Sequence, residues 1–111
     1  MDTKRAVRLI RRVAGAGGRI TLLTGAGVSA ASGVPTFRGP KGFWTPGSPD
    51  HVAPQRLTRA AFEADPGASW RLHLELLDRF ADARPNASHH ASAELEATLG
   101  NRFTLVTQNV D

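Results

Sequence analysis

The chain has 111 residues, of which 41% are hydrophobic, and a formal net charge of +4. A chain of this length can form one small domain, because it can bury well over half of its surface. No apolar stretch approaches the roughly 20 residues that a membrane-spanning helix needs, and the N-terminus lacks the apolar region of a secretory signal. These features predict an intracellular protein without a membrane partner, and we expect it to be cytoplasmic.

Basic residues are concentrated at the start of the chain, where residues 1–19 hold six of them and one acidic residue. Apolar residues recur there at helical spacing and predict a helix from about 3 to 14: Val7, Ile10, Val13 and Ala14. A basic amphipathic start can bind nucleic acid or membranes, or resemble an organelle transit peptide. The simpler interpretation is a solvated face on a helix that packs on a sheet, so we expect no nucleic-acid partner.

The next segment is typical of a buried parallel strand, at residues 20–24, that opens into a glycine turn. Gly25 and Gly27 can take positive φ, which lets backbone N–H groups approach an anion. A helix that begins near Val28 would direct its positive end to the same point, which favours a pyrophosphate. The span from Gly25 to Ala30 fits the dinucleotide pattern G-x-G-x-x-G/A, although a plain tight turn can show it too.

A long loop follows this turn in place of a second strand with an acidic end. The segment from Ser32 to Pro35 breaks the helix after little more than one turn, and a loop rich in Gly and Pro continues to about Pro54. Loops of this length are usually functional covers or disordered. Its aromatic residues favour a cover, because disordered linkers lack them.

The rest of the chain predicts three helices and one strand. The helices cover about 56–64, 69–83 and 87–99, separated by Pro66-Gly67 and Pro85-Asn86, and Gly100 caps the last of them. A second strand covers 102–107. The predicted fold class is α/β, the beginning of a Rossmann-like parallel sheet that stops after its second strand.

Two motifs in this sequence resemble those of the sirtuin family of NAD-dependent protein deacylases. Residues 25–38 match GAGxSxxSGxPxFR, and Thr107 to Asp111 match TQNxD. A weaker match lies at residues 85–89, and the resemblance covers roughly residues 5–111. It implies that 1–111 is the N-terminal part of a sirtuin-type NAD-binding catalytic domain, with a cofactor-binding loop at about 33–54 and a helical segment at about 56–99.

The resemblance also implies a cofactor site and a reaction. The family's pyrophosphate turn falls on Gly25, Ala26 and Gly27, and Arg38 would lie near a phosphate or ribose. Phe37 would cover the nicotinamide ribose, and Asp111 would accept from the carboxamide. The full set of expected cofactor-binding residues is Gly25, Ala26, Gly27, Ser29, Thr36, Phe37, Arg38, Trp44, Gln108, Asn109 and Asp111.

The family's remaining chemical groups are not in this sequence. Sirtuins carry a general-base histidine in a His-Gly motif after TQNxD, so no catalytic residue is expected within 1–111. A zinc module of four cysteines would need a longer chain, since this one has no cysteine. His73, His89 and His90 favour structural roles over metal binding, and so does the acidic stripe of Glu75, Asp78 and Asp82.

The complete enzyme implied by the resemblance transfers an acyl group from a lysine of a protein or peptide to ADP-ribose and releases nicotinamide. Many sirtuins have Asp where Thr36 stands. In having Thr there, this sequence is similar to a subgroup that includes removers of acidic acyl groups, which bind the acyl carboxylate with a Tyr-x-x-Arg pair. Alignment on Trp70 places His73 and Leu76 there, which favours an acetyl or other uncharged acyl group. Two alternatives stay open: a non-catalytic module that binds NAD or ADP-ribose, and an ADP-ribosyltransferase. Inactivity of residues 1–111 alone is expected.

Overall fold

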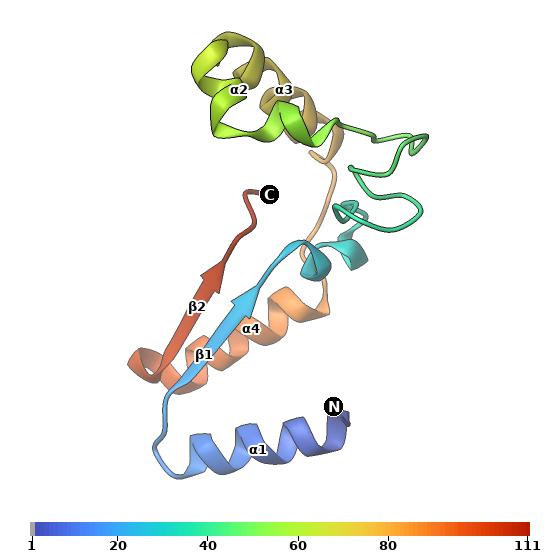
Figure 1. The fold of residues 1–111 in the computed structure, drawn as a ribbon. Helices are drawn as coiled ribbons and strands as arrows, with labels where there is room; N and C mark the ends of the chain where they lie inside the picture. The colour runs from blue at the N-terminus through green and yellow to red at the C-terminus, as the bar shows by residue number, and fades with distance from the viewer. Residues whose placement is uncertain (1) are drawn as a thin grey trace. The chain divides into compact units, whose positions relative to one another are not determined.

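The computed structural model describes residues 2–111, which divide into two compact units (Figure 1). Unit 1 comprises the chain up to Gly25 together with Pro85–Gln108. Unit 2 comprises Ala26–Arg84 and Asn109–Asp111.

Unit 1 is built on a two-stranded parallel sheet. Strand β1 (Ile20–Thr24) pairs with β2 (Phe103–Thr107), in a register that joins Ile20 to Phe103 and Thr24 to Thr107. Helix α1 (Thr3–Gly15) contacts β1, and helix α4 (Ala87–Leu99) contacts β2 (Figure 1). This arrangement confirms the predicted α/β class with a parallel sheet. The second strand begins one residue later than predicted, because Gly100–Arg102 form a 3-10 helix.

Side-chain caps and one arginine fix the ends of the unit 1 helices. The Asp2 carboxylate accepts from the Lys4 amide at 3.1 Å and starts α1. Arg102 donates to the carbonyls of Ala14 and Gly18, each at 3.1 Å, and so ties the start of β2 to the end of α1. At α4, the Asn86 side chain accepts from the backbone, and His89 Nδ1 accepts from the Asn86 amide at 3.1 Å.

Unit 2 contains 3-10 helices, two α-helices and the long loop. Two 3-10 helices, η1 (Ala26–Val28) and η2 (Ala30–Ser32), precede the loop. A third, η3 (Pro54–Leu57), leads to α2 (Arg59–Ala64) and α3 (Pro66–Arg79). The predicted helix at 56–64 is therefore interrupted, because Thr58 is extended and caps α2. The helix predicted at 69–83 lies at 66–79, since Asp65 caps it and Pro66 occupies its first turn.

The core of unit 2 joins the loop to α3. Phe43, Val52 and Leu72 are buried together, and the Phe43 and Phe80 rings meet edge to face at 5.8 Å. The loop thus contributes aromatic side chains to the core of unit 2, and its role as a cover stays a prediction. Among residues 2–111, no helix combines the length and the apolar character that crossing a bilayer requires.

The glycine turn differs from its prediction in two ways. Within residues 2–111, positive φ occurs at Gly17, Gly33, Gly39, Gly47 and Gly100, so the prediction of positive φ at Gly25 and Gly27 is wrong. No α-helix begins near Val28 either, because two three-residue 3-10 helices, η1 and η2, occupy this stretch. Such short helices align few peptide dipoles. The turn can therefore bind an anion through its backbone N–H groups, with little contribution from a helix dipole.

Candidate cofactor site

The two strands of unit 1 end at the same edge of the sheet. Gly25 follows β1 and Gln108 follows β2, and the Gln108 amide donates to the Thr24 carbonyl at 3.2 Å. A Cβ added at Gly25 would lie 3.8 Å from Gln108 Oε1. Open α/β sheets bind ligands beyond the carboxyl ends of their strands. Both residues therefore occupy the edge of the sheet at which a cofactor is expected.

In unit 2, one hydrogen bond connects the two motifs. Asn109 Nδ2 donates to Ser29 Oγ at 3.1 Å, across 80 positions of sequence. Ser29 is only 2% exposed, and its carbonyl accepts from the amides of Ser32 and Val34. Ser29 was predicted to bind the cofactor, and the structure places its hydroxyl against Asn109. The geometry indicates that Ser29 orients the Asn109 side chain.

The segment from Thr36 to Thr45 is a hydrogen-bonded turn. The Phe43 amide donates to the Thr36 carbonyl at 3.0 Å. Two hydroxyls brace the turn from inside: Thr36 Oγ1 donates to the Arg38 carbonyl at 2.7 Å, and Thr45 Oγ1 donates to that of Gly39 at 2.6 Å. The turn therefore holds the backbone of Arg38 in one place.

Aromatic rings and a cation share one side of this turn. The Phe37 and Trp44 rings lie 4.9 Å apart, and the Arg38 guanidinium lies 5.3 Å from the centre of the Trp44 ring. Among residues 2–111, Trp44 Nε1 is buried without a hydrogen-bond partner. Phe37 is 41% exposed. The arrangement leaves one apolar ring and one positive charge available to a ligand.

A hollow of about 600 Å³ in unit 2 includes part of the predicted site. Thr36 and Arg38 line it together with Lys41 and Asp50. Asp50 also lies 3.5 Å from Arg79, which offsets part of its negative charge. Lys41 was not among the residues expected from the sequence, although its place between Pro40 and Gly42 puts it in the predicted loop. Thr45 was not expected either, and no motif residue marks it.

Three further residues of the predicted site, Ala26, Gly27 and Asp111, lie in unit 2. Ala26 and Gly27 lie in η1, and a Cβ added at Gly27 would meet no atom within 4 Å. Asp111 is exposed in the last segment of unit 2. Gly25 and Gln108 belong to unit 1, and the remaining predicted residues belong to unit 2.

Two of the histidines, His73 and His89, have structural contacts. His73 Nδ1 lies 2.7 Å from the Ser69 carbonyl on α3, and His89 completes the cap of α4. Glu75, Asp78 and Asp82 are exposed, in agreement with a solvated stripe. Within residues 2–111, no group of three or more histidine or acidic side chains could hold a metal ion.

The sequence matches the Sir2 family over residues 25–111. It is 46% identical over 93 residues to NAD-dependent protein deacylase 1 of Archaeoglobus fulgidus, covering 83% of this chain and 36% of the relative. It is 43% identical over 95 residues to the mitochondrial NAD-dependent protein deacylase sirtuin-5 of Danio rerio, covering 83% of this chain and 30% of the relative. The chain thus spans about a third of the length of these curated relatives.

Solved structures show the same likeness. Two mutants of a Sir2 homologue, each in complex with ADP-ribose, match with TM-scores of 0.66 and 0.68 and identities of 38% and 39%. Each match covers 100% of this chain and 41% of the homologue. These two structural matches therefore include both motifs and both strands of the parallel pair. The chain therefore belongs to the Sir2 family, the sirtuins.

Proposed function

We propose that this chain is the N-terminal part of an NAD-dependent protein-lysine deacylase and that its two motifs bind NAD. The observation that carries the proposal is the likeness of residues 25–111, which hold both motifs, to the Sir2 family. Relatives that are 46% and 43% identical to it over 93 and 95 residues are named NAD-dependent protein deacylases. The homologue structures hold ADP-ribose, the part of NAD that remains when nicotinamide leaves.

The turn after β1 and the hollow suit the phosphates of such a ligand. Gly27 presents backbone with no atom within 4 Å of where its Cβ would be, so an anion can approach it closely. Arg38 and Lys41 bring positive charge to the hollow, and cations form strong hydrogen bonds with phosphate oxygens. We assign the pyrophosphate to Gly25, Ala26 and Gly27, and a phosphate or ribose oxygen to Arg38.

The second motif would hold the nicotinamide end. NAD, when bound, supplies the ADP-ribose group that accepts the acyl group as nicotinamide leaves. Gln108, Asn109 and Asp111 carry the amide and carboxylate groups that can hydrogen-bond nicotinamide and its ribose. The bond from Asn109 to Ser29 limits the rotation of the Asn109 amide, which favours a defined ligand pose. Phe37, with its exposed ring, would keep water from the reacting end.

The remaining parts of the proposal concern the complete protein. Its substrate would be an acyl-lysine of a protein or peptide, with an uncharged acyl group because His73 and Leu76 replace the tyrosine and arginine of the acid-selective subgroup. The general-base histidine would follow Asp111. We also propose a cytoplasmic location for the protein.

Calorimetric titration with NAD and with ADP-ribose tests the cofactor site. We expect both to bind, and Asn109→Ala to weaken NAD binding at least about tenfold, because a lost hydrogen bond in a binding site is worth on the order of 1 kcal/mol or more. Asn101→Ala is the matched control, since Asn101 is exposed in unit 1 outside both motifs, and its affinity should equal that of the unchanged chain. Absence of binding by the unchanged chain, or equal affinity in a folded Asn109→Ala variant, would refute the assignment.

A further inference from the structure

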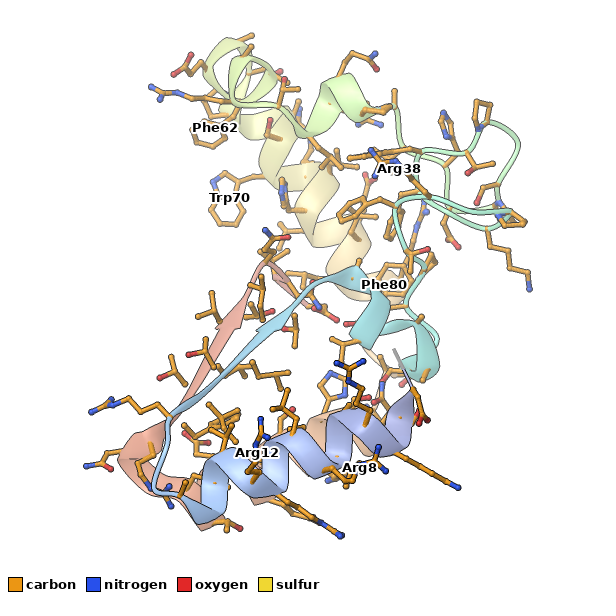
Figure 2. The ribbon with its side chains drawn as sticks, turned by 60° about the horizontal axis from the view of Figure 1, so that its bottom comes forward. Arg8, Arg12, Arg38, Phe62, Trp70 and Phe80 are labelled. Atoms are coloured by element: carbon orange, nitrogen blue, oxygen red, sulfur yellow. The ribbon has the colours of Figure 1, made fainter. Side chains whose placement is uncertain are left out.

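Helix α1 carries a row of positive charges on one side. Five exposed residues between positions 4 and 12 form it, here called the basic face: Lys4, Arg5, Arg8, Arg11 and Arg12. Because an α-helix turns about 100° and rises about 1.5 Å per residue, they fall within about 120° of arc and about 12 Å of length. Figure 2 labels Arg8 and Arg12 on this helix.

The basic face lacks acidic partners. Helix α1 contains no acidic residue, and the carboxylate of the preceding Asp2 accepts from a backbone amide. The ion pairs among residues 2–111 are Arg59–Glu63 and Arg79–Asp50, both in unit 2. Surface helices commonly intersperse both signs and form pairs three or four residues apart. The five cations of α1 are free to meet an external anion.

The surplus of positive charge is confined to the unit that holds α1. Unit 1 contains seven basic and three acidic residues, whereas unit 2 contains seven of each, so the whole formal net charge of +4 lies on unit 1. Arg102 adds to it at the C-terminal end of α1, where its guanidinium donates to the Ala14 carbonyl at 3.1 Å. Such a one-sided distribution attracts a polyanion.

We propose that the basic face of α1 binds the phosphate backbone of double-stranded nucleic acid without sequence preference. Duplex DNA presents one negative charge per about 1.7 Å of axis, so a row of cations about 12 Å long can engage several phosphates. Four of the five cations are arginines, whose planar guanidinium groups bind phosphate oxygens in pairs. The role does not depend on NAD binding, and it replaces the expectation from sequence that these side chains are merely solvated.

The residue composition of α1 favours a duplex over single-stranded nucleic acid. The helix has no aromatic residue, whereas single-stranded nucleic acid is held by stacking on aromatic rings. Helices that lie in a membrane surface use Trp, Phe or Leu on an apolar side that enters the lipid. In α1, Val7, Leu9 and Ile10 are 40–46% exposed and Val13 lies against the backbone at Gly18, so the apolar residues of this helix are aliphatic and include no Trp or Phe.

Fluorescence anisotropy with a labelled 20-base-pair duplex of random sequence tests the proposal on the full chain. With five phosphate contacts, log K should fall against log salt with a slope of about −4.5, a loss of about 500-fold between 50 and 200 mM salt. Arg8→Ala with Arg11→Ala should weaken binding at least about tenfold at 100 mM salt and make the slope shallower by about 2. Alanine favours helix, so the change should preserve α1, as circular dichroism can verify.

Two controls complete the design. Arg56→Ala with Arg71→Ala removes the same charge from exposed positions of unit 2 and should leave binding within about twofold, since that unit is outside the proposed contact. Arg8→Lys with Arg11→Lys keeps the charge and should retain most of the affinity. The proposal is overturned by no duplex binding at 50 mM salt, by equal losses in both alanine pairs, or by tighter binding to phosphatidylserine vesicles or single-stranded DNA than to the duplex.

Discussion

A hydrogen bond joins the side chains of Ser29 and Asn109, two residues that lie 80 positions apart in the sequence. Ser29 is almost fully buried, and its hydroxyl accepts from the Asn109 amide at 3.1 Å. A buried polar group that loses its partner costs about 1–3 kcal/mol. The pair therefore contributes to the stability of unit 2 as well as to the orientation of Asn109.

A double-mutant cycle measures this coupling. We expect Ser29→Ala to lower the free energy of unfolding by about 1–2 kcal/mol, and the effects of Ser29→Ala and Asn109→Ala to fall short of additivity by about 1 kcal/mol. Urea denaturation followed by circular dichroism gives the four values. Strict additivity would mean that the bond contributes nothing in solution.

Gly27 provides a second prediction at this scale. Gly27→Val should leave the melting temperature within a few degrees, because the added side chain meets no atom within 4 Å of its Cβ. It should weaken NAD binding at least about tenfold, because the same open space is where we place the pyrophosphate. Calorimetry and thermal melts check both, and unchanged NAD affinity in the folded variant would place the phosphates elsewhere.

At the scale of elements, the turn from Thr36 to Thr45 decides where Arg38 lies. A Cβ added at Gly42 would come within 2.7 Å of the Arg38 carbonyl carbon and 2.8 Å of its Cα. Backbone atoms cannot give way as a flexible side chain can. The close approach of these two chain segments therefore requires glycine at position 42.

Gly42→Ala should accordingly displace Arg38 and reduce NAD affinity several-fold, with the helical content of α2 and α3 retained. Gly15→Ala is the matched control, because a Cβ there meets nothing within 4 Å and alanine is the better helix former. Calorimetry for affinity and far-ultraviolet circular dichroism for helix content are the measurements. Equal affinities in the two variants would contradict the role given to the turn.

At the scale of the whole molecule, much apolar surface is open to solvent. Trp70 is 61% exposed, and Leu74 and Leu77 on the same helix are 57% and 54% exposed. In unit 1, Leu23 is 67% exposed, and the two-stranded sheet depends on its packing against α1 and α4, because two strands by themselves are marginally stable. We expect residues 1–111 alone to be marginally stable and prone to association.

Two substitutions on α3 separate exposed from buried apolar surface. Trp70→Gln should reduce binding of a hydrophobic dye without loss of helix, whereas Leu72→Gln should unfold unit 2, because Leu72 is 4% exposed in its core. Dye fluorescence and circular dichroism are the measurements. A sharp cooperative melt of a monomeric chain that binds no dye would contradict the expected marginal stability.

Catalysis is also a property of the whole molecule. We expect purified residues 1–111 to show no NAD-dependent deacylation of an acetyl-lysine peptide, since His73 and His89 have structural partners and the base is expected after Asp111. Mass spectrometry of the peptide detects the product. Turnover above a matched blank, with contaminating enzyme excluded, would show that a residue of this chain supplies the base.

The sequence by itself determined the elements whose signals are local. The bounds of α1, of the strand at 20–24 and of the helix at 87–99 match the structure closely, because periodicity and caps act within a few residues. The predicted burial of that strand is wrong, since Leu23 is 67% exposed and no residue of β1 is buried. The two motifs likewise sufficed to identify the family. The assignment of individual residues to the cofactor rests on those motifs and stays a prediction.

Only the tertiary structure decided contacts between residues distant in sequence. It paired β1 with β2 in register, set the Ser29 hydroxyl against Asn109, and brought Lys41 to the hollow with Arg38. It also showed that position 42 requires glycine because a Cβ there would clash with the backbone of Arg38. Gly27, in contrast, does not adopt a positive φ. A side chain's partners depend on which distant segments the fold brings next to it, and residue spacing along the sequence does not specify those segments.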